Sequence, residues 1–154
     1  TQHGRPRVAV DLFSGTGPIA LHLAAHAERV IAVENWAPSV EVLRENLALN
    51  NVQNVDAVAA DINQSHPPGI PSRVALVVVD PPRPGLSPRA IEWVTSRQPE
   101  SVIYVSCNPA TLARDLKLFL QAPYQIETIE PFDLFPHTYH IETLVLLRRT
   151  STSE

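Results

Sequence analysis

Short apolar runs rich in valine and isoleucine alternate along the chain with longer segments whose apolar positions recur every three or four residues. The short runs predict strands, and the longer segments predict amphipathic helices. Strands are expected at residues 8–13, 30–34, 55–61, 74–80, 101–106, 124–131 and 141–148. Helices are expected at residues 17–27 and 38–50, from Ser87 to about Arg97, and from Asn108 to about Leu120.

This alternation predicts an α/β protein with a Rossmann-like, doubly wound and mostly parallel sheet of seven strands. Residues 63–73 contain three prolines and a glycine, so a loop is expected where another helix could have been. The last two strands have no helix between them, which predicts that they pair antiparallel. Ligands of such sheets bind beyond the carboxyl ends of the strands. The polar motifs at those ends should therefore share one crevice.

Composition narrows the classes of function. A chain of 154 residues with 44% hydrophobic residues suits one globular domain. The net charge of −4 argues against strong nonspecific binding of nucleic acid by this chain alone. The single cysteine, Cys107, excludes an internal disulfide and an all-cysteine metal site. Together with the lack of a signal peptide and of a long apolar run, it favours a reducing, cytoplasmic location and no membrane span.

The stretch DLFSGTGPIA holds the first candidate site. Its glycines, Gly15 and Gly17, let a backbone approach a ligand, and Glu34 at the end of the second strand can bind ribose hydroxyls. NAD and S-adenosylmethionine (SAM) both use such a layout. Three residues separate Asp11 from Gly15, whereas a dinucleotide loop begins almost directly after its strand. An acid at the strand end repels a pyrophosphate but can hold the ammonium of a methionine moiety, so the spacing favours SAM.

A second group of residues suggests the reaction. Asp80-Pro81-Pro82-Arg83 ends the fourth strand, and the Arg83 guanidinium could contact a base carbonyl, contact a phosphate, or hold Asp80 in place. Cys107 follows the fifth strand and precedes a helix, whose positive end favours a thiolate. A thiolate beside SAM suits methylation of a pyrimidine carbon. Its addition to carbon 6 makes carbon 5 nucleophilic, and the thiolate leaves once the carbon 5 proton is removed.

The segments DLFSGTG, DPPRPGL, VSCNPATLARD and FPHTYHIETLVLL, in this order over nearly the whole chain, resemble the RNA uracil-5-methyltransferase family, which forms 5-methyluridine in tRNA and rRNA. The resemblance implies SAM as cofactor and RNA as substrate, with Cys107 as nucleophile and Glu142 as base. Related cytosine-5 enzymes carry Pro-Cys after the fourth strand, where this chain has Pro-Pro.

The same resemblance assigns further roles. It implies that Asp80 and Arg83 organise the site, with Asp80 also near SAM. Asn108 is a candidate substrate contact beside Cys107, and His140 could either orient Glu142 or contact RNA. The cofactor would be lined by Phe13, Gly15, Glu34 and Asp61, in addition to Asp11 and Gly17. A metal is not expected at His137, His140 and Glu142, because they lie on a turn entering a strand and no H-E-x-x-H pattern is present.

The chain departs from the family in its length. Family members usually carry an N-terminal RNA-binding module and a segment with a glutamine that reaches SAM, and Pro18 replaces a polar residue of several relatives. The chain contains no methionine, and only seven residues precede its first expected strand, which predicts a catalytic domain cut from a longer protein. Its target uracil must be flipped or single-stranded, so the missing RNA-binding region is expected to be needed.

Two alternatives remain open from the residues. One is a SAM-dependent methyltransferase that acts on a nitrogen atom, with Cys107 incidental, since a lone cysteine is often a small buried hydrophobe. The other is a SAM-binding domain without catalysis of its own.

Overall fold

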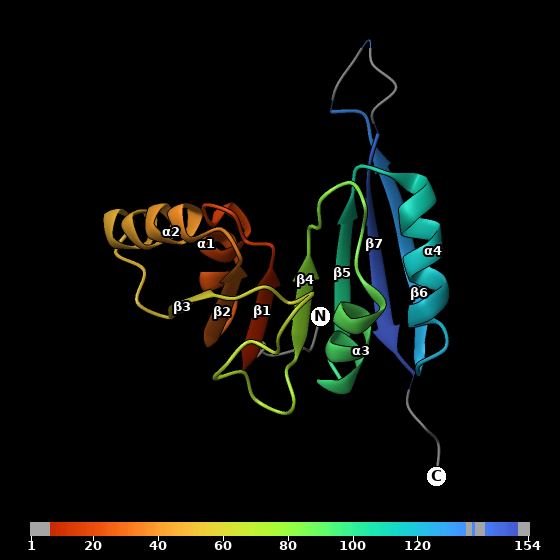
Figure 1. Ribbon diagram of the computed structural model, residues 1–154, viewed down its shortest axis with the longest axis horizontal. Helices are drawn as coiled ribbons and strands as arrows, with labels where there is room; N and C mark the ends of the chain where they lie inside the picture. The colour runs from red at the N-terminus through yellow and green to blue at the C-terminus, as the bar shows by residue number, and fades with distance from the viewer. Residues whose placement is uncertain (1–6, 135–136, 138–140, 151–154) are drawn as a thin grey trace.

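Seven strands and four helices make up the part of the chain that the computed structural model describes, which is residues 7–134, 137 and 141–150 (Figure 1). The strands are β1 (Val8–Leu12), β2 (Arg29–Glu34), β3 (Val55–Ala59), β4 (Leu76–Val79), β5 (Ser101–Ser106), β6 (Tyr124–Phe132) and β7 (Glu142–Arg149). The helices are α1 (Pro18–Ala24), α2 (Ala37–Leu49), α3 (Pro88–Ser96) and α4 (Pro109–Phe119).

All seven strands form one sheet, in the order β3-β2-β1-β4-β5-β7-β6. The pairs from β3 to β5 are parallel, whereas β7 runs antiparallel to both β5 and β6. The expected seven-stranded, mostly parallel sheet is therefore confirmed, including the antiparallel pairing of its last two strands. A bulge between Ile126 and Thr128 interrupts the register of β6, the outermost of these strands.

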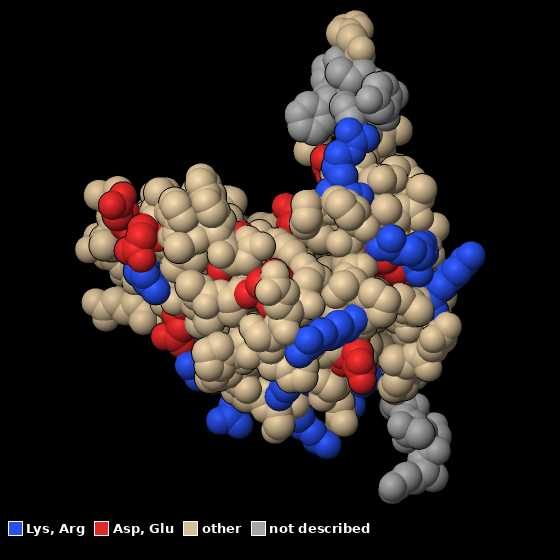
Figure 2. Space-filling view, in the orientation of Figure 1, with Lys and Arg blue, Asp and Glu red and all other residues tan. Residues whose placement is uncertain are grey.

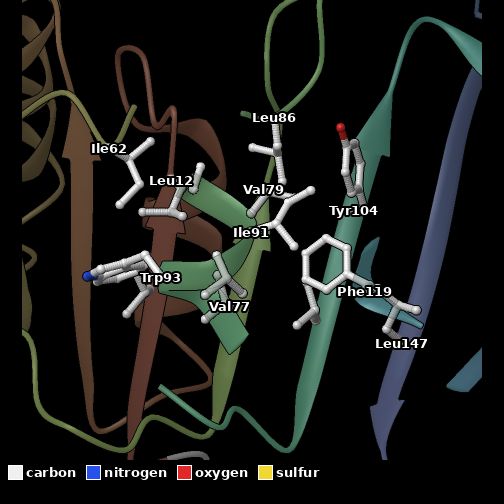
Figure 3. Packing of buried hydrophobic residues seen from close by; sticks show 14 of the residues in the cluster. Leu12, Ile62, Val77, Val79, Leu86, Ile91, Trp93, Tyr104, Phe119 and Leu147 are labelled. Carbon is white, nitrogen blue, oxygen red and sulfur yellow. The ribbon is translucent and has the colours of Figure 1, made fainter. Parts of the chain in front are cut away.

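Each face of the sheet packs against its own helices, as a doubly wound fold requires. On one face, small strand residues such as Ala9 and Ala32 lie against Leu23 of α1 and Leu43 of α2. On the other face, the alternate strand residues pack against Trp93 of α3, and against Leu112, Leu116 and Phe119 of α4. Figure 3 shows Trp93 and Phe119 lying over strand residues of this second cluster. The period of two along the buried strands separates the two cores.

The segment from 63 to 73 contains no helix, as its prolines predicted. Ile62 and Val74 at its ends are buried, and Ile70 packs against the same core cluster as α3. This loop therefore covers part of the sheet where a helix would otherwise lie. No helix among the described residues is long and apolar enough to cross a membrane.

Several expected boundaries differ from the structure by one to three residues, and two of them have a clear local cause. The first helix ends at Ala24 rather than at residue 27, because the N–H groups of His26 and Ala27 both donate to the Leu23 carbonyl and close the helix in a tight turn. The fourth strand begins at Leu76 rather than at residue 74, since the Val74 N–H donates to the Arg97 carbonyl instead of to a neighbouring strand.

We expect Gly17→Ala to destabilise the protein by about 1–3 kcal/mol. Gly17 has a φ of 94°, and an added Cβ would overlap Cδ1 of Leu43, which is fully buried, so the leucine would have to shift within a packed core. Gly69→Ala is the matched control, because Gly69 also has a positive φ of 74° but has nothing within 4 Å of the added atom. Urea unfolding should show a larger loss for Gly17→Ala; equal losses would contradict the overlap with Leu43.

Candidate active site

The polar motifs converge at the carboxyl ends of the parallel strands, as their positions predicted. Figure 2 shows a hollow between the side formed by α1 and α2 and the side formed by β6 and β7, with acidic atoms exposed around it. Two parts of this region can be distinguished. The glycine loop and Glu34 lie at the ends of β1 and β2, and a cavity lies at the ends of β4, β5 and β7.

The loop after β1 is a sequence of tight turns. Phe13, Gly15 and Gly17 have φ angles of 63°, 54° and 94°. A positive φ costs a bulky residue such as Phe13 roughly 1–3 kcal/mol, so the surrounding structure must hold it there. The Ser14 N–H donates to the Val33 carbonyl at 3.1 Å and ties this turn to β2. A Cβ on Gly15 would meet no atom within 4 Å, which leaves open space directly above the loop.

Glu34 fixes the glycine loop from the neighbouring strand. Its Oε2 accepts a hydrogen bond from the Gly15 N–H at 3.0 Å, and its Oε1 accepts one from the Trp36 N–H at 2.8 Å. Each oxygen keeps a second lone pair for a ligand hydroxyl. Glu34 therefore has a structural role in the loop that the sequence did not indicate, in addition to the expected role at a ribose.

Asp11 is a fully buried carboxyl beneath this loop. Neither of its oxygens has a hydrogen-bond partner among the described residues. Burial, followed by the charge of Asp80 and more weakly that of Glu34, raises the pKa of Asp11 from 3.8 to about 7. The Ala20 backbone N–H lowers this pKa slightly, although its geometry falls short of a hydrogen bond. An unpaired buried acid of this kind suits a ligand that brings a positive charge.

Cys107 and Glu142 line one cavity of about 360 Å³. Asp80 contributes a second carboxyl, and the remaining lining is mostly apolar, from Val105, Phe132, Leu134, Thr143 and Leu144. A volume of this size lies within the usual range for small-ligand pockets. The cavity thus combines one thiol and two carboxyls with an apolar wall, which suits a flat, weakly polar ring.

Strand pairing explains why the thiol and Glu142 meet. β5 and β7 are antiparallel, with Ser106 opposite Thr143. Cys107 follows Ser106, and Glu142 precedes Thr143, so continuing this register brings the two residues opposite each other at the sheet edge. The Ser106 hydroxyl accepts from the Asn108 N–H at 3.1 Å and holds the turn in which Cys107 lies. Asn108 then caps α4 by accepting from the Ala110 N–H at 3.1 Å.

Asp80 lies between the two parts of the region, since it acts on the pKa of Asp11 and also lines the cavity. The residue is exposed to solvent, but its carboxyl lies in the cavity wall. Desolvation there, followed by the charge of Glu142, raises the pKa of Asp80. Asp80 therefore connects the glycine loop with the cavity that holds Cys107.

Other expected site residues lie outside this cavity. The Arg83 side chain is exposed and makes no ion pair with Asp80 in the described structure. One of the three roles expected for Arg83, holding Asp80 in place, is therefore not observed. The Asn108 amide instead donates to the Arg83 carbonyl at 3.3 Å. Asp61 accepts from the Asn63 N–H at 2.9 Å and closes the turn after β3. His140 lies outside the described residues.

Sequence reasoning missed Tyr104, Arg114 and Asp115, which form a polar network in which Tyr104 and Asp115 are buried and Arg114 reaches solvent. A signal was present, because Asp115 occupies the apolar face of α4 among Leu112, Leu116 and Phe119. A carboxylate in that position needs partners. Within the described ranges, no group of three or more His, Cys, Asp or Glu residues could hold a metal ion.

The strand order and crevice are those of the Rossmann-like fold of SAM-dependent methyltransferases. A SAM-dependent methyltransferase from Aquifex aeolicus shares the fold, with a TM-score of 0.68 at 10% identity over 92% of this chain and 82% of that one. The tRNA (uracil-54, C5)-methyltransferase of Pyrococcus abyssi, solved with S-adenosyl-L-homocysteine, matches with a TM-score of 0.80 and 33% identity. That match covers 92% of this chain and 34% of the other.

Residues 72–150 match the family model of tRNA (uracil-5-)-methyltransferases, and the chain belongs to this family. The model of the TRM5/TYW2 methyltransferase domain matches residues 2–83, the half that carries the glycine loop. An RNA methyltransferase of uncharacterized specificity from Caldanaerobacter subterraneus is 41% identical over 91% of this chain. Another from Clostridium tetani is 40% identical over 96% of it. The chain spans 31% and 32% of those two proteins, about a third of their length.

We expect the raised pKa of Asp11 to make stability fall with pH. The carboxyl ionises near 3.8 when unfolded and near 7 when folded, so its stabilising protonation is complete below pH 3.8 and is lost as the pH rises through 7. Relative to Asp11→Asn, the wild type should lose on the order of 4 kcal/mol of unfolding free energy across this range.

Urea unfolding between pH 4 and pH 8 measures this difference. Asp133→Asn, at an exposed position, is the control and should follow the wild-type curve. The unfolding free energy of Asp11→Asn should still fall with pH, but less steeply than that of the wild type, because Asp80 also has a raised pKa. Parallel curves for the wild type and Asp11→Asn would show that Asp11 is ionised in the folded protein.

Proposed function

We propose that this chain is the catalytic domain of a SAM-dependent methyltransferase that methylates carbon 5 of a uridine in tRNA or rRNA. The observation that carries the proposal is the cavity in which Cys107 and Glu142 face each other beside Asp80. A nucleophile that adds to carbon 6 and a base that removes the proton from carbon 5 must act on neighbouring atoms of one ring. Family membership over residues 72–150, which include all three residues, supports the same reaction.

The residues around β1 and β2 fit the binding of SAM. Asp11 offers an unpaired buried carboxyl for the ammonium, and the space over Gly15 allows close approach to the loop. Glu34 retains lone pairs for ribose hydroxyls, while Phe13 and Asp61 would complete the cofactor site. Bound there, SAM would supply an electrophilic methyl group on the side of the cavity marked by Asp80.

In the proposed mechanism, the Cys107 thiolate forms a bond to carbon 6 of uracil, and the electron pair of the 5,6 double bond moves onto the carbonyl at carbon 4. Carbon 5 thereby becomes nucleophilic enough to be methylated. Glu142 then removes the carbon 5 proton. The double bond re-forms, and the carbon–sulfur bond breaks to release the Cys107 thiolate.

RNA would reach the cavity as an unstacked base. The acidic surroundings of the cavity do not attract phosphates, so the exposed Arg83 guanidinium is the group near the site suited to a phosphate or a base carbonyl. Asn108 and His140 are proposed as further substrate contacts. We infer that the RNA-binding surface of the whole protein lies largely outside this chain, and that the protein acts in the cytoplasm, where a single reduced cysteine is stable.

Methylation of a nitrogen atom is the competing function. The glycine-loop half, which also matches the TRM5/TYW2 methyltransferase domain, would serve such an enzyme equally well, because SAM binding at that loop does not require a thiol. Such an enzyme would not need Cys107. Methyl transfer that survives alkylation of Cys107 would favour the nitrogen enzyme over the carbon 5 enzyme.

A covalent-capture experiment tests the nucleophile. With SAM and a 5-fluorouridine stem-loop RNA at high concentration, the chain should form a stable methylated adduct, because fluorine at carbon 5 cannot be removed as a proton. Intact mass spectrometry should detect this adduct in the wild type and not in Cys107→Ala. The same RNA with ordinary uridine is the control and should release its product.

An adduct that persists in Cys107→Ala would remove Cys107 from the mechanism. Failure of the wild type to form an adduct while both SAM and the stem-loop RNA are bound would contradict the proposed function of this chain.

The role of Glu142 is tested with uridine RNA that carries no fluorine. In Glu142→Gln, the Cys107 thiolate should still add to carbon 6, and carbon 5 should still be methylated. Elimination should be slower by about 10²–10⁴-fold, because the base is missing. A covalent RNA–protein species should therefore accumulate, visible on a denaturing gel. Glu130→Gln, a change of an exposed glutamate on β6, is the matched control and should not accumulate it. Normal turnover by Glu142→Gln would exclude Glu142 as the base.

A further inference from the structure

The segment between β4 and α3, residues 80–87, carries both Asp80 and Arg83, and its path decides where Asp80 lies in the cavity. Leu86 anchors its far end in the core, and polar groups of α4 hold its backbone at two points. At the first point, the Arg83 carbonyl accepts hydrogen bonds from the Asn108 amide at 3.3 Å and the Thr111 hydroxyl at 3.1 Å. Both donors belong to the first turn of α4 or its cap, directly after Cys107.

The second point is Asp115, a fully buried carboxylate one turn from the end of α4. Its Oδ2 accepts a hydrogen bond from the Leu86 N–H at 2.7 Å. Arg114 donates to Asp115 Oδ1 at 2.8 Å, and also to the carbonyls of Pro84 and Leu86 at 2.8 and 3.2 Å. One acid and one guanidinium thus hold consecutive backbone groups of the segment.

The fit between the segment and Asp115 is close. Gly85 has a φ of 77°, and a Cβ added there would lie 2.5 Å from Asp115 Oδ2. The backbone therefore approaches the carboxylate at a distance that leaves no room for a side chain. This approach lets the Leu86 N–H reach Asp115 directly.

Tyr104 of β5 completes the network. Its hydroxyl donates to the same Oδ2 of Asp115 at 2.7 Å. Figure 3 shows the Tyr104 ring beside Leu86, with its hydroxyl toward the carboxyl end of the sheet. Burial, followed by the hydrogen bond to Asp115, raises the pKa of Tyr104, so the hydroxyl remains a donor. Two residues further along, β5 ends at Ser106 and the chain continues to Cys107.

We propose that Asp115, held by Tyr104 and Arg114, is a positioning residue that fixes the segment bearing Asp80 and Arg83 against the strand and helix on either side of Cys107. The inference rests on the proposed function and adds a residue group to it. A buried carboxylate with its donors is costly to desolvate, and apolar side chains of the same volume stabilise a fold at least as well. The ionic network instead fixes the position and orientation of the segment backbone, because hydrogen bonds depend on distance and angle.

Two tyrosine variants separate positioning from stability. Tyr104→Phe removes the bond to Asp115, and Tyr124→Phe removes a comparable buried bond, from the Tyr124 hydroxyl to the Pro99 carbonyl at 2.9 Å. The second bond lies at the opposite end of the sheet, where β6 begins and β5 has not yet started. Both changes delete one oxygen from a buried ring. Tyr104→Phe should lower the melting temperature more, because its bond is to a carboxylate rather than to a neutral carbonyl, so rates are compared at a temperature where both variants are fully folded.

The measurement is the rate constant of adduct formation on 5-fluorouridine RNA at saturating RNA and SAM, with SAM affinity and melting temperature measured in parallel. Tyr104→Phe should slow adduct formation by about tenfold or more, since small displacements of reacting groups have effects of this size. Tyr124→Phe should change it by less than about twofold, as expected for a site outside the network. Tyr124→Phe should not alter SAM affinity. Saturating SAM offsets any loss of affinity in Tyr104→Phe, whose network holds the segment bearing Asp80.

A second variant tests the carboxylate itself. Asp115→Asn keeps the size of the side chain but turns an amide toward the Arg114 guanidinium, and should slow adduct formation at least as much as Tyr104→Phe. If the two residues act as one unit, the double variant should be no slower than Asp115→Asn alone.

Equal adduct rates for Tyr104→Phe and Tyr124→Phe would overturn the positioning role and leave the proposed function intact. A wild type that forms no adduct would instead overturn the proposed function, and the positioning role with it. The two failures are thus distinguished by whether the wild type reacts.

Discussion

The antiparallel placement of β7 between β5 and β6 is the constraint on which the candidate site depends. Because β7 runs against the other central strands, its first residue, Glu142, lies at the edge where β5 ends. If β7 were parallel, Glu142 would begin at the opposite edge. A strand of 8 residues would then separate it from Cys107 by roughly 25 Å. The reversed strand thus allows a residue late in the chain to face Cys107.

The charges of the region follow from the same convergence. Parallel strands deliver Asp11, Glu34 and Asp80 to one edge, and β7 adds Glu142. The pKa values of Asp11 and Asp80 are raised by burial and by these neighbouring acids. Such a field favours a cationic ligand and opposes phosphates close to the cavity. This acidic field is consistent with the proposal that the crevice binds the cofactor and the target base, while the RNA backbone is bound elsewhere.

The sequence predicted the fold well, because long periodic segments and buried valine-rich strands leave few alternatives. It also predicted that Asp80 and Cys107 would share a crevice, since position at the carboxyl end of a strand is enough for that inference. Glu142 begins its strand, and only the resemblance to the family pointed to it. Local hydrogen bonds determine the features that the pattern of apolar and polar residues could not predict. The end of α1 depends on two N–H groups that share the Leu23 carbonyl, and the use of Glu34 by the glycine loop depends on backbone geometry. Asp115 was missed because its partners come from three separate segments.

Asp11 has a consequence for how the crevice takes up its ligand. Because burial raises the pKa of this carboxyl to about 7, part of it is protonated near neutral pH, and an ammonium can pair only with the ionised form. Uptake of a cation is therefore an exchange, in which a proton leaves the protein as the ligand enters. Below pH 7 the apparent affinity for such a ligand falls, by up to about tenfold for each pH unit. The buried acid thus makes the occupancy of the crevice sensitive to acidification of its surroundings, without any histidine.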